Sequence, residues 1–358
     1  MARAINVGVV GCGYWGPNLI RNFRALPDCR LKSMCDLSDQ RLNHLGALYR
    51  DVGIQKDFKQ LLADPELDAI VVSTPVGQHY RMAKASLEAG KHTFVEKPLA
   101  RSTAECEELI ALAQQQGLIL MVGHTFLYSP AVRRMKDMVD KGMVGKLQYI
   151  SANRSNLGLF QKDINVTWDL APHDISIVLY LMEQMPVSVN CLGNAHVTAG
   201  VQDVTNMALT FENGCFAVIQ SSWLSPRKVR EMTAVGSKKM IVYDDMEPCE
   251  KLKVYDTRVD APPHYDTFAE FQYSYHHGDR FVPHFKQEEP LKVECQHFLD
   301  CIKEQSTPLS DGVKGLQLVQ ILEAASASLE QQGASVSLAK PTVPLPTCVP
   351  ELELVEVA

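Results

Sequence analysis

The sequence lacks the marks of several protein classes, and each absence narrows the range of functions. Its ten cysteines form no C-x-x-C pair and do not alternate with histidines at the spacing of a zinc site. We therefore expect neither a disulfide framework nor a metal site. The thiols are better interpreted as small buried apolar groups of a protein in a reducing compartment.

Long apolar runs and a net positive charge are also missing. No segment approaches the length of a membrane span, and no basic and apolar signal region precedes the first predicted strand. The formal net charge of -7 gives no electrostatic reason to expect nucleic acid or an anionic membrane as a partner. We therefore expect a cytoplasmic protein that binds neither.

Length and composition are those of a globular protein with more than one domain. Hydrophobic residues make up 46% of the 358 residues and charged residues 22%, so nothing in the composition indicates disorder. A chain of this length exceeds one compact core of typical size. We predict a first domain over residues 1–122, a second over residues 123–340, and an extended, proline-rich tail over residues 341–358.

A glycine-rich turn near the start organises the first domain. An apolar run ending at Val10 is followed by G-x-G-x-x-G and then by a helical pattern from Asn18 to Leu26. In such a strand, turn and helix, Gly11 makes the turn, Gly13 lets the backbone approach a pyrophosphate, and Gly16 lets helix and strand pack closely. The free N–H groups of the helix N-terminus favour phosphate. The residues of the predicted dinucleotide site here are Gly11, Cys12, Gly13, Tyr14, Trp15 and Gly16.

An acidic residue after the second predicted strand indicates which dinucleotide binds. Asp36 lies twenty residues after Gly16, where a carboxylate accepts hydrogen bonds from the adenosine ribose hydroxyls and repels a 2′-phosphate. We therefore expect NAD rather than NADP. Ser38 and Arg41 are near enough to help a 2′-phosphate if the acid turned away, so some use of NADP stays open.

Short apolar strands alternate with helical patterns from residue 5 to about residue 122. The predicted strands are Ile5 to Val10, Arg30 to Cys35, Ala69 to Ser73, His92 to Val95 and Ile119 to Val122. This alternation builds βαβ units, and hence an α/β fold with a parallel, doubly wound sheet. Ligands of such sheets bind at the carboxyl ends of the strands. The residues expected near the nicotinamide half of the cofactor are Thr74, Pro75 and His79, and the further predicted cofactor-binding residues at these strand ends are Ser73, Glu96 and Lys97.

After a predicted helix at Pro130 to Lys141, strand and helix patterns no longer alternate in the sequence. Strand-like segments follow one another, and Asn213-Gly214 marks a hairpin turn. The segments are Leu147 to Arg154, Ser188 to His196, Asp203 to Phe211, Cys215 to Trp223, Arg230 to Val235 and Met240 to Tyr243. We predict an α+β domain with a large, open, mostly antiparallel sheet, whose exposed face suggests a homodimer or a homotetramer.

Residues 245–290 show poor periodicity and predict a long loop or a hairpin insertion, before two helices at 291 to 305 and Val313 to Gln331. The segment contains His276, His277 and His284. With no periodic frame and no acidic ligands at fixed spacing, these histidines are interpreted as part of a polar loop rather than a metal site.

Glu96-Lys97-Pro98 directly follows the predicted strand at His92 to Val95. A lysine at the carboxyl end of a parallel strand points into the ligand crevice, and the proline behind it fixes the turn. Lys97 could then stabilise the negative charge that develops on a reacting hydroxyl. The alternative is a solvated lysine paired with Glu96.

A second polar group opens the predicted helix from Asp169 to Glu183. Asp169 suits the N-cap, and Pro172 is tolerated only in the first turn, so together they set the predicted helix start. His173 lies four residues after Asp169 and on the same face. Near a helix N-terminus it should be neutral and able to accept a proton. The alternative is a capping aspartate beside a packed histidine.

Three separated motifs in register resemble the glucose-fructose oxidoreductase and inositol dehydrogenase family, Gfo/Idh/MocA. They are the glycine-rich turn with Asp36, Glu96-Lys97-Pro98, and Asp169-x-x-x-His173, and the resemblance extends from residue 5 to about residue 332. It implies a Rossmann domain that binds NAD(P), a second α/β domain with an open sheet for oligomerisation, and a catalytic group of Lys97, Asp169 and His173. The residues before Asp169 and Asp174 after His173 depart from the usual pattern.

Further stretches resemble the branch of the family that oxidises nucleotide-linked sugars, such as the UDP-N-acetylglucosamine 3-dehydrogenases. They are residues 11–18, residues 123–130 and Trp168 to Ile175. This likeness implies oxidation of a sugar 3-hydroxyl by NAD, with the keto product aminated by a partner transaminase. Another sugar or polyol dehydrogenase of the family, or a non-catalytic NAD-binding sensor or repressor, stays open.

Substrate contacts are expected from the loop before the catalytic helix and from the end of the last Rossmann strand. The candidates are His124, Tyr128, Arg154, Asn156, Lys162 and Trp168. Arg154 and Lys162 could meet a sugar diphosphate, or could equally be solvated loop charges. A deep cationic pocket around Arg154 would favour a nucleotide sugar over a free sugar.

Overall fold

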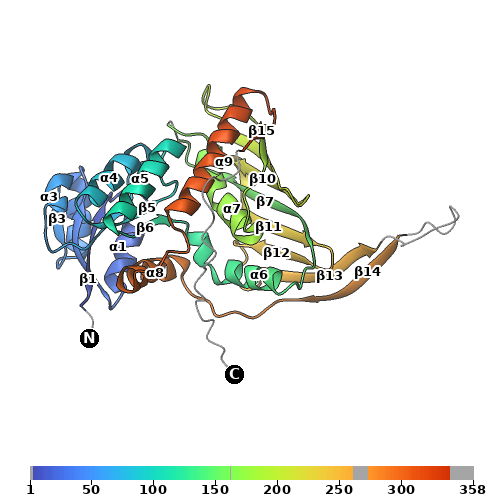
Figure 1. The fold of residues 1–358 in the computed structure, drawn as a ribbon, viewed down its shortest axis with the longest axis horizontal. Helices are drawn as coiled ribbons and strands as arrows, with labels where there is room; N and C mark the ends of the chain where they lie inside the picture. Colours follow the sequence, from blue (N-terminus) through green and yellow to red (C-terminus); the bar gives the residue numbers. More distant parts are fainter. Residues whose placement is uncertain (1–2, 162, 261–272, 339–358) are drawn as a thin grey trace.

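The computed structural model describes residues 3–161, 163–260 and 273–338, where the chain forms two sheets with helices packed on them (Figure 1). The strands of the first sheet are β1 (Ile5–Val10), β2 (Cys29–Cys35), β3 (Gly53–Gln55), β4 (Ala69–Val72), β5 (His92–Glu96) and β6 (Leu120–Gly123). Their order is β3-β2-β1-β4-β5-β6, and all neighbours are parallel. The predicted doubly wound sheet is confirmed. The sequence pattern did not predict β3, which is three residues long and lacks an apolar run.

Helices cover both faces of this sheet because alternate strand residues are apolar on opposite sides. The helices beside it are α1 (Gly16–Ala25), α2 (Asp39–Leu48), α3 (Phe58–Leu62), α4 (His79–Glu88), α5 (Thr103–Gln116) and α8 (Pro290–Glu304). Val7 and Val9 pack with α1, α2 and α8, whereas Val10 and Val72 pack with α3, α4 and α5. Helix α8 therefore returns from the far end of the chain to complete the first layer (Figure 1).

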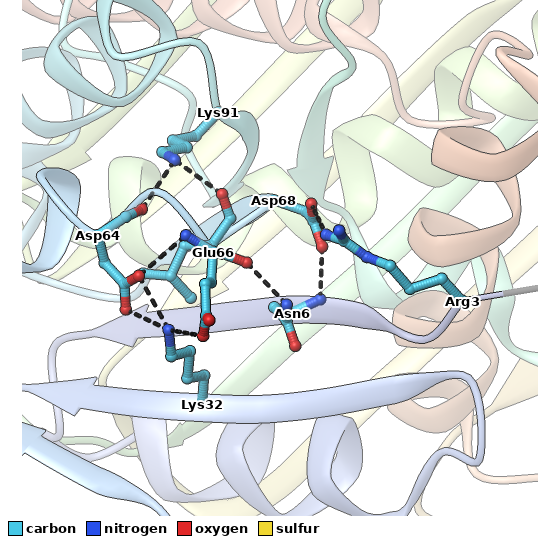
Figure 2. A network of polar contacts seen from close by, with 8 residues as sticks. Arg3, Asn6, Lys32, Asp64, Glu66, Asp68 and Lys91 are labelled. Atoms are coloured by element: carbon cyan, nitrogen blue, oxygen red, sulfur yellow. Dashed lines mark hydrogen bonds and ion pairs between the residues drawn. The ribbon is translucent and has the colours of Figure 1, made fainter.

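A network of polar contacts closes the amino-terminal edge of the parallel sheet (Figure 2). The backbone N–H of Asn6 donates to Asp68 Oδ2 at 2.8 Å, and Lys32 Nζ lies 2.7 Å from Asp64 Oδ2. Lys91 Nζ donates to the carbonyl oxygens of Asp64 and Leu67 at 3.0 and 2.7 Å. These bonds tie the starts of the strands together and leave the opposite, carboxyl-terminal edge to the ligand.

The second sheet is built from the second half of the chain. Its strands are β7 (Leu147–Leu157), β8 (Ser188–Asn194), β9 (Val204–Thr210), β10 (Phe216–Ser222), β11 (Leu224–Gly236), β12 (Met240–Asp244), β13 (Leu252–Asp260), β14 (Ser274–Phe281) and β15 (Val336–Ser337). The order is β14-β13-β12-β11-β7-β10-β9-β8-β15, and only the β10–β7 pair is parallel. The mostly antiparallel sheet is confirmed. Gly214, with φ of +83°, lies in the predicted turn between β9 and β10.

One face of the second sheet is covered and the other is open. Helices α6 (Pro130–Asp140), α7 (Val166–Met182) and α9 (Gly312–Glu330) pack their apolar side chains on the covered face. On the open face the rings of Tyr149 and Phe216 stack at 5.5 Å between centroids, and both are exposed. The open face expected from the sequence is therefore present in the described part of the chain.

Strands β13 and β14 pair as a hairpin that projects from the edge of the sheet, which confirms the hairpin alternative for residues 245–290 (Figure 1). The predicted tail, residues 341–358, lies outside the described residues. Among the helices that are described, none has the length and apolarity to cross a bilayer.

Candidate active site

The turn after β1 forms a cradle that only glycine permits. Gly11 has φ of +97°, and a Cβ there would lie 2.4 Å from the carbonyl oxygen of Ser73. A Cβ at Gly16 would lie 2.0 Å from the carbonyl oxygen of Gly11, whereas Gly13 faces open space apart from Arg41 Nη1 at 3.9 Å. The three glycines thus have the geometry of a turn, an open approach for a pyrophosphate and a close packing contact.

Helix α1 starts directly behind this turn and leaves its first N–H groups available. Its N-cap residue, Trp15, makes no side-chain capping bond to any described residue, and Pro17 occupies its first turn without an N–H to satisfy. The first turn carries no acidic residue. The helix N-terminus can therefore donate hydrogen bonds to the phosphates of a dinucleotide.

Asp36 follows β2 with its side chain 8% exposed and fixed from two sides. Its Oδ2 accepts a bond from the Cys12 N–H at 2.7 Å, and its Oδ1 accepts one from the Ser38 N–H at 2.8 Å. Arg41 Nη1 lies 3.6 Å from Oδ2. The carboxylate is thus fixed beside the glycine-rich turn, where it can meet ribose hydroxyls. Cys12 contributes its backbone here, since its side chain is buried and does not line the cavity.

The loop after β4 supplies polar atoms that the chain leaves unsatisfied. The hydroxyl oxygens of Ser73 and Thr74 are buried and lack a hydrogen-bond partner among the described residues, and both residues line the cavity with Pro75. Such atoms fit a bound polar ligand. His79 is different, because its Nδ1 and Nε2 atoms each lie 2.8 Å from a carbonyl oxygen, those of Pro98 and Thr74, and its ring N–H donates to one of the two. It holds the loop in place.

A cavity of about 1960 Å³ runs along this edge and continues between the two sheets. Ligand pockets of roughly 300–1,000 Å³ suffice for one drug-sized molecule. The cavity therefore has room for a dinucleotide and a second large ligand. Its lining includes Gly13, Asp36 and Lys97 from the first half of the chain and Asn156, His173 and Arg230 from the second.

Lys97 follows β5 and reaches across to helix α7. Its Nζ donates to the carbonyl oxygen of Asp169 at 2.8 Å and lies 3.8 Å from Asp169 Oδ1. The indole N–H of Trp223 donates to Asp169 Oδ2 at 3.0 Å. The structure thus brings the predicted lysine and aspartate together and adds Trp223, which the sequence did not single out.

Helix α7 begins earlier than the sequence suggested. Asn165, not Asp169, is its N-cap and accepts a bond from the Trp168 N–H at 3.2 Å, while the Val166 N–H bonds the carbonyl oxygen of Gln202 at 3.0 Å. The prediction that Asp169 caps the helix is wrong. Pro172 lies inside the helix, where the earlier cap and tertiary contacts offset a cost of about 3 kcal/mol.

His173 is on the cavity-facing side of α7, one turn after Asp169, and its ring meets Phe126 edge-on with centroids 5.0 Å apart. Burial lowers the pKa of His173 well below its usual value, and the positive charges of Lys97, Arg154 and Arg230 lower it further. The imidazole is therefore neutral, and it can accept a proton. Because the helix starts earlier, burial and these cations account for the neutral form rather than the helix dipole.

The six predicted substrate contacts fall into three groups. Asn156 and Trp168 line the cavity. Arg154 is buried and bonds Asp174 through two contacts of 2.7 and 2.9 Å, so the expected cationic pocket around Arg154 is absent from the described cavity lining. His124 and Tyr128 are buried and do not line the cavity; the Tyr128 hydroxyl lies 3.0 Å from Ser310 Oγ. Lys162 lies outside the described residues.

Arg154 was expected to supply positive charge to the cavity. Two basic side chains of β11 supply it instead. Lys228 and Arg230 line the cavity, and Arg230 Nη1 bonds Asp245 Oδ2 at 3.2 Å. The sequence analysis missed both because they lie more than fifty residues after the catalytic helix begins, in a strand pattern that also fits a solvent-facing edge. Among the described residues, no group of three potential ligands could hold a metal ion.

The glycine-rich turn forms a site for a dinucleotide, and the same cavity holds the neutral imidazole of His173 and the amino group of Lys97. Together these features define the class of protein. It is an NAD-dependent oxidoreductase. Residues 5–124 match the profile described as the oxidoreductase family Gfo/Idh/MocA, NAD-binding Rossmann fold, and residues 132–242 match the Gfo/Idh/MocA C-terminal domain. The two matched ranges span more than half of the chain, which belongs to the Gfo/Idh/MocA family.

Full-length relatives support this assignment. The chain is 28% identical to the oxidoreductase YrbE of Bacillus subtilis over 92% of its length and 95% of that protein. It is 27% identical to the UDP-N-acetylglucosamine 3-dehydrogenase of Acidithiobacillus ferrooxidans (88% and 94% covered) and 24% identical to the myo-inositol 2-dehydrogenase of Thermotoga maritima (92% and 97%). The solved A. ferrooxidans enzyme, GnnA, shares the fold, with a TM-score of 0.77, 24% identity, and 93% and 99% of the two chains covered.

Proposed function

We propose that this protein oxidises the 3-hydroxyl of UDP-N-acetylglucosamine, or of a closely related UDP-sugar, to the 3-keto sugar with NAD. The keto group would then be the substrate of a partner aminotransferase. The proposal is consistent with the name of the A. ferrooxidans relative, which is similar along nearly its whole length. It is also supported by the sequence stretches of this chain that resemble the nucleotide-sugar branch of the family.

The observation that carries the proposal is the lining of the cavity beyond Lys97 and His173. The cavity of about 1960 Å³ exceeds what one ligand needs, and its lining includes the basic groups Lys228 and Arg230 and the apolar side chains of Leu157 and Leu159. Lys228 is exposed, with no ion pair to another described residue. A diphosphate linked to a nucleoside needs cationic and apolar contacts of this kind, whereas a free hexose or inositol does not.

The residues at the centre of the cavity suit the removal of a hydroxyl proton. NAD, when bound, supplies the acceptor for the hydride that leaves the carbon atom. Neutral His173 accepts the proton of the hydroxyl group, as a general base does. The Lys97 ammonium donates a hydrogen bond to the oxygen as negative charge develops there. Asp169 holds Lys97 through its carbonyl oxygen, and Trp223 fixes the Asp169 carboxylate.

The first experiment mixes the purified protein with NAD and UDP-N-acetylglucosamine, with a transaminase and its amino donor present to draw off the product. Absorbance follows NADH, and mass spectrometry identifies the sugar. A 3-keto or 3-amino product is the expected result. NADH formation with myo-inositol or glucose instead would show that the substrate is not a UDP-sugar. Myo-inositol is included because the T. maritima relative is named a myo-inositol 2-dehydrogenase. No reaction with any sugar, despite binding of NAD, would favour a sensor.

A further inference from the structure

Two buried carboxyl groups, those of Glu96 and Glu294, have no part in the mechanism above. Glu96, the last residue of β5, is 9% exposed and lines the cavity. Glu294, on the returning helix α8, is fully buried at 0% exposure. A carboxylate costs free energy to bury unless it is paired and hydrogen-bonded. Two such groups at one place therefore require an explanation.

The segment at and just after the end of β6 contacts both side chains, and the charge of Glu96 acts on Glu294. Glu96 is paired with Gly123 in the ladder between β5 and β6. Its carboxyl group covers that glycine, since a Cβ at position 123 would lie 3.0 Å from it. Two residues further on, Thr125 Oγ1 donates to Glu294 Oε2 at 2.7 Å. Gly123 and Thr125 thus contact Glu96, the last residue of β5, and Glu294 of α8 at one buried site.

Each carboxyl group keeps one oxygen atom unsatisfied. Glu96 Oε2 accepts a long bond of 3.3 Å from the Lys97 N–H, and Glu294 Oε2 accepts the bond from Thr125. The Oε1 atoms of both residues are buried and find no hydrogen-bond partner within the described parts of the chain. Two carboxylates cannot bond each other, but a carboxylic acid can donate its proton to a carboxylate. One shared proton would satisfy both groups.

The electrostatics identify which group holds the proton. Burial raises the pKa of Glu96 to about 7, while Lys97 and the Trp15 indole favour its charged form. Burial, together with the charge of Glu96, raises the pKa of Glu294 well above its usual range. Glu294 is therefore a neutral acid at neutral pH, and Glu96 is the member that ionises.

The other titratable groups around the pair stay neutral near pH 7, apart from the Lys97 ammonium. Burial lowers the pKa of His124 to about 3 and raises the pKa values of Tyr128 and Cys295 well above their usual ranges. Each of these three groups is therefore uncharged. The ionisation of Glu96 is the one change of charge expected in this cluster between pH 6 and pH 8.5.

We propose that Glu96 and Glu294 form a carboxyl pair that holds one proton beside the cofactor, so that the ionised pair favours oxidised NAD over NADH and the fully protonated pair loses this preference. The physical reason is charge: the oxidised nicotinamide ring is positive and the reduced ring is neutral, so only the oxidised ring gains from a nearby carboxylate. Glu294 is a positioning residue, because it acts through Glu96.

The pair would also take part in the proton balance of the reaction. Oxidation of an alcohol by NAD gives a ketone, NADH and one proton, which His173 first accepts from the hydroxyl. Once the ring has become neutral, the carboxylate of Glu96 loses its favourable interaction and binds a proton more readily. The pair can then hold one proton while cofactor and product fill the cavity. This role in turnover rests on the proposed function, whereas the effect on cofactor binding does not.

The test measures the dissociation constants of NAD and NADH, without sugar, by quenching of tryptophan fluorescence from pH 6 to pH 8.5. The ratio of the NADH constant to the NAD constant should rise roughly tenfold across this range, with a midpoint near pH 7. Glu96→Gln should make the ratio independent of pH. The exposed residue Glu88 provides a matched control, and Glu88→Gln should leave the rise unchanged. Because no sugar is present, failure of the substrate proposal cannot affect this result.

Two variants at position 294 test the role of the second acid. Glu294→Gln keeps a neutral hydrogen-bond donor and should retain the midpoint, whereas Glu294→Met removes the donor and should move the midpoint at least one pH unit higher. A purely structural role would lower the affinity for both cofactors in both variants and would not move the midpoint. A ratio that does not change with pH in the unaltered protein, or an unchanged rise in Glu96→Gln, would overturn the proposal. Equal midpoints in Glu294→Gln and Glu294→Met would overturn the role of Glu294.

Discussion

At the residue scale, the activity depends on side chains whose surroundings fix their charge. Lys97 donates to the Asp169 carbonyl oxygen and lies near its carboxylate, and His173 is neutral because burial and nearby cations lower its pKa. A charged donor and a neutral acceptor on opposite sides of a bound alcohol can remove its proton in one step. The chemistry therefore needs both protonation states to be maintained across neutral pH.

Lys97→Met tests the charged donor. The variant should lower kcat about 100-fold or more while leaving the Kd of NAD within about threefold, because the bond to the oxygen strengthens only as charge develops. Steady-state kinetics and a binding titration measure the two effects. Lys56→Met, at an exposed lysine that also lines the cavity, is the control and should change kcat little. A Lys97→Met variant of normal kcat would remove the residue from the mechanism.

Asp36→Ala tests the cofactor preference. The change removes the carboxylate that meets the ribose hydroxyls and frees Arg41, which lies 3.6 Å from it, for a 2′-phosphate. The ratio of kcat/KM for NAD to that for NADP should fall at least tenfold. If the ratio stays unchanged, Asp36 does not select between the cofactors.

Other residue roles could not be obtained from the sequence. Arg154 looked like a free cation because its partner, Asp174, lies twenty residues away and only the packing of β7 on α7 brings them together. Glu294 was not singled out from the sequence, because its burial depends on the return of α8 to the first sheet. Lys97, Asp169 and His173 could be proposed because the family resemblance selects these motif positions, whereas the local patterns alone left an alternative open for each group.

At the element scale, the strand, turn and helix around the glycines were predictable from local sequence. The parallel, doubly wound sheet also follows from the alternation of strand and helix patterns. The start of α7 was not predictable, because Asn165 and Asp169 are both good caps, and a backbone bond from Val166 to Gln202 helps to place the start. Local sequence preference determines whether a segment forms a helix or a strand, and contacts with residues far along the chain determine where the element begins.

Gly16→Ala tests the close packing of the turn. Its added Cβ would lie 2.0 Å from the Gly11 carbonyl oxygen, so the turn must move and NAD binding should weaken at least 100-fold. Gly46→Ala is the matched control. Its Cβ would be in ordinary contact with Ile54 at 3.5 Å inside α2, and it should stabilise the protein by about 0.5–1 kcal/mol. NAD titration and thermal unfolding measure both; equal NAD affinity in the two variants would contradict the cradle.

At the scale of the whole molecule, the last part of the chain holds the two sheets in one structure. Helix α8 packs on the first sheet and α9 packs on the second, while Val319 of α9 also joins the core of the first. The cavity therefore lies between layers that share a core, with residues of both sheets in its wall. This arrangement places cavity-lining residues of β7 and β11 in the same cavity as the residues of β1 and β5 and the turns that follow them.

The open sheet face leads to a prediction about assembly. Tyr149 and Phe216 form an exposed aromatic pair on it, and we expect this face to bind a second copy of the chain as a homodimer or within a homotetramer. Phe216→Glu should shift the mass in multi-angle light scattering toward the monomer, whereas Leu48→Glu on exposed α2 should not. A monomeric unaltered protein would contradict the prediction.

The most direct test of the central claim follows one hydrogen atom. UDP-N-acetylglucosamine carrying deuterium at C3 is incubated with the protein and unlabelled NAD, and mass spectrometry examines both products. The account predicts deuterium in the NADH and a 3-keto sugar that has lost it, with both signals greatly reduced in Lys97→Met. Unlabelled NADH, or NADH that forms only with another sugar or polyol, would contradict oxidation at this position.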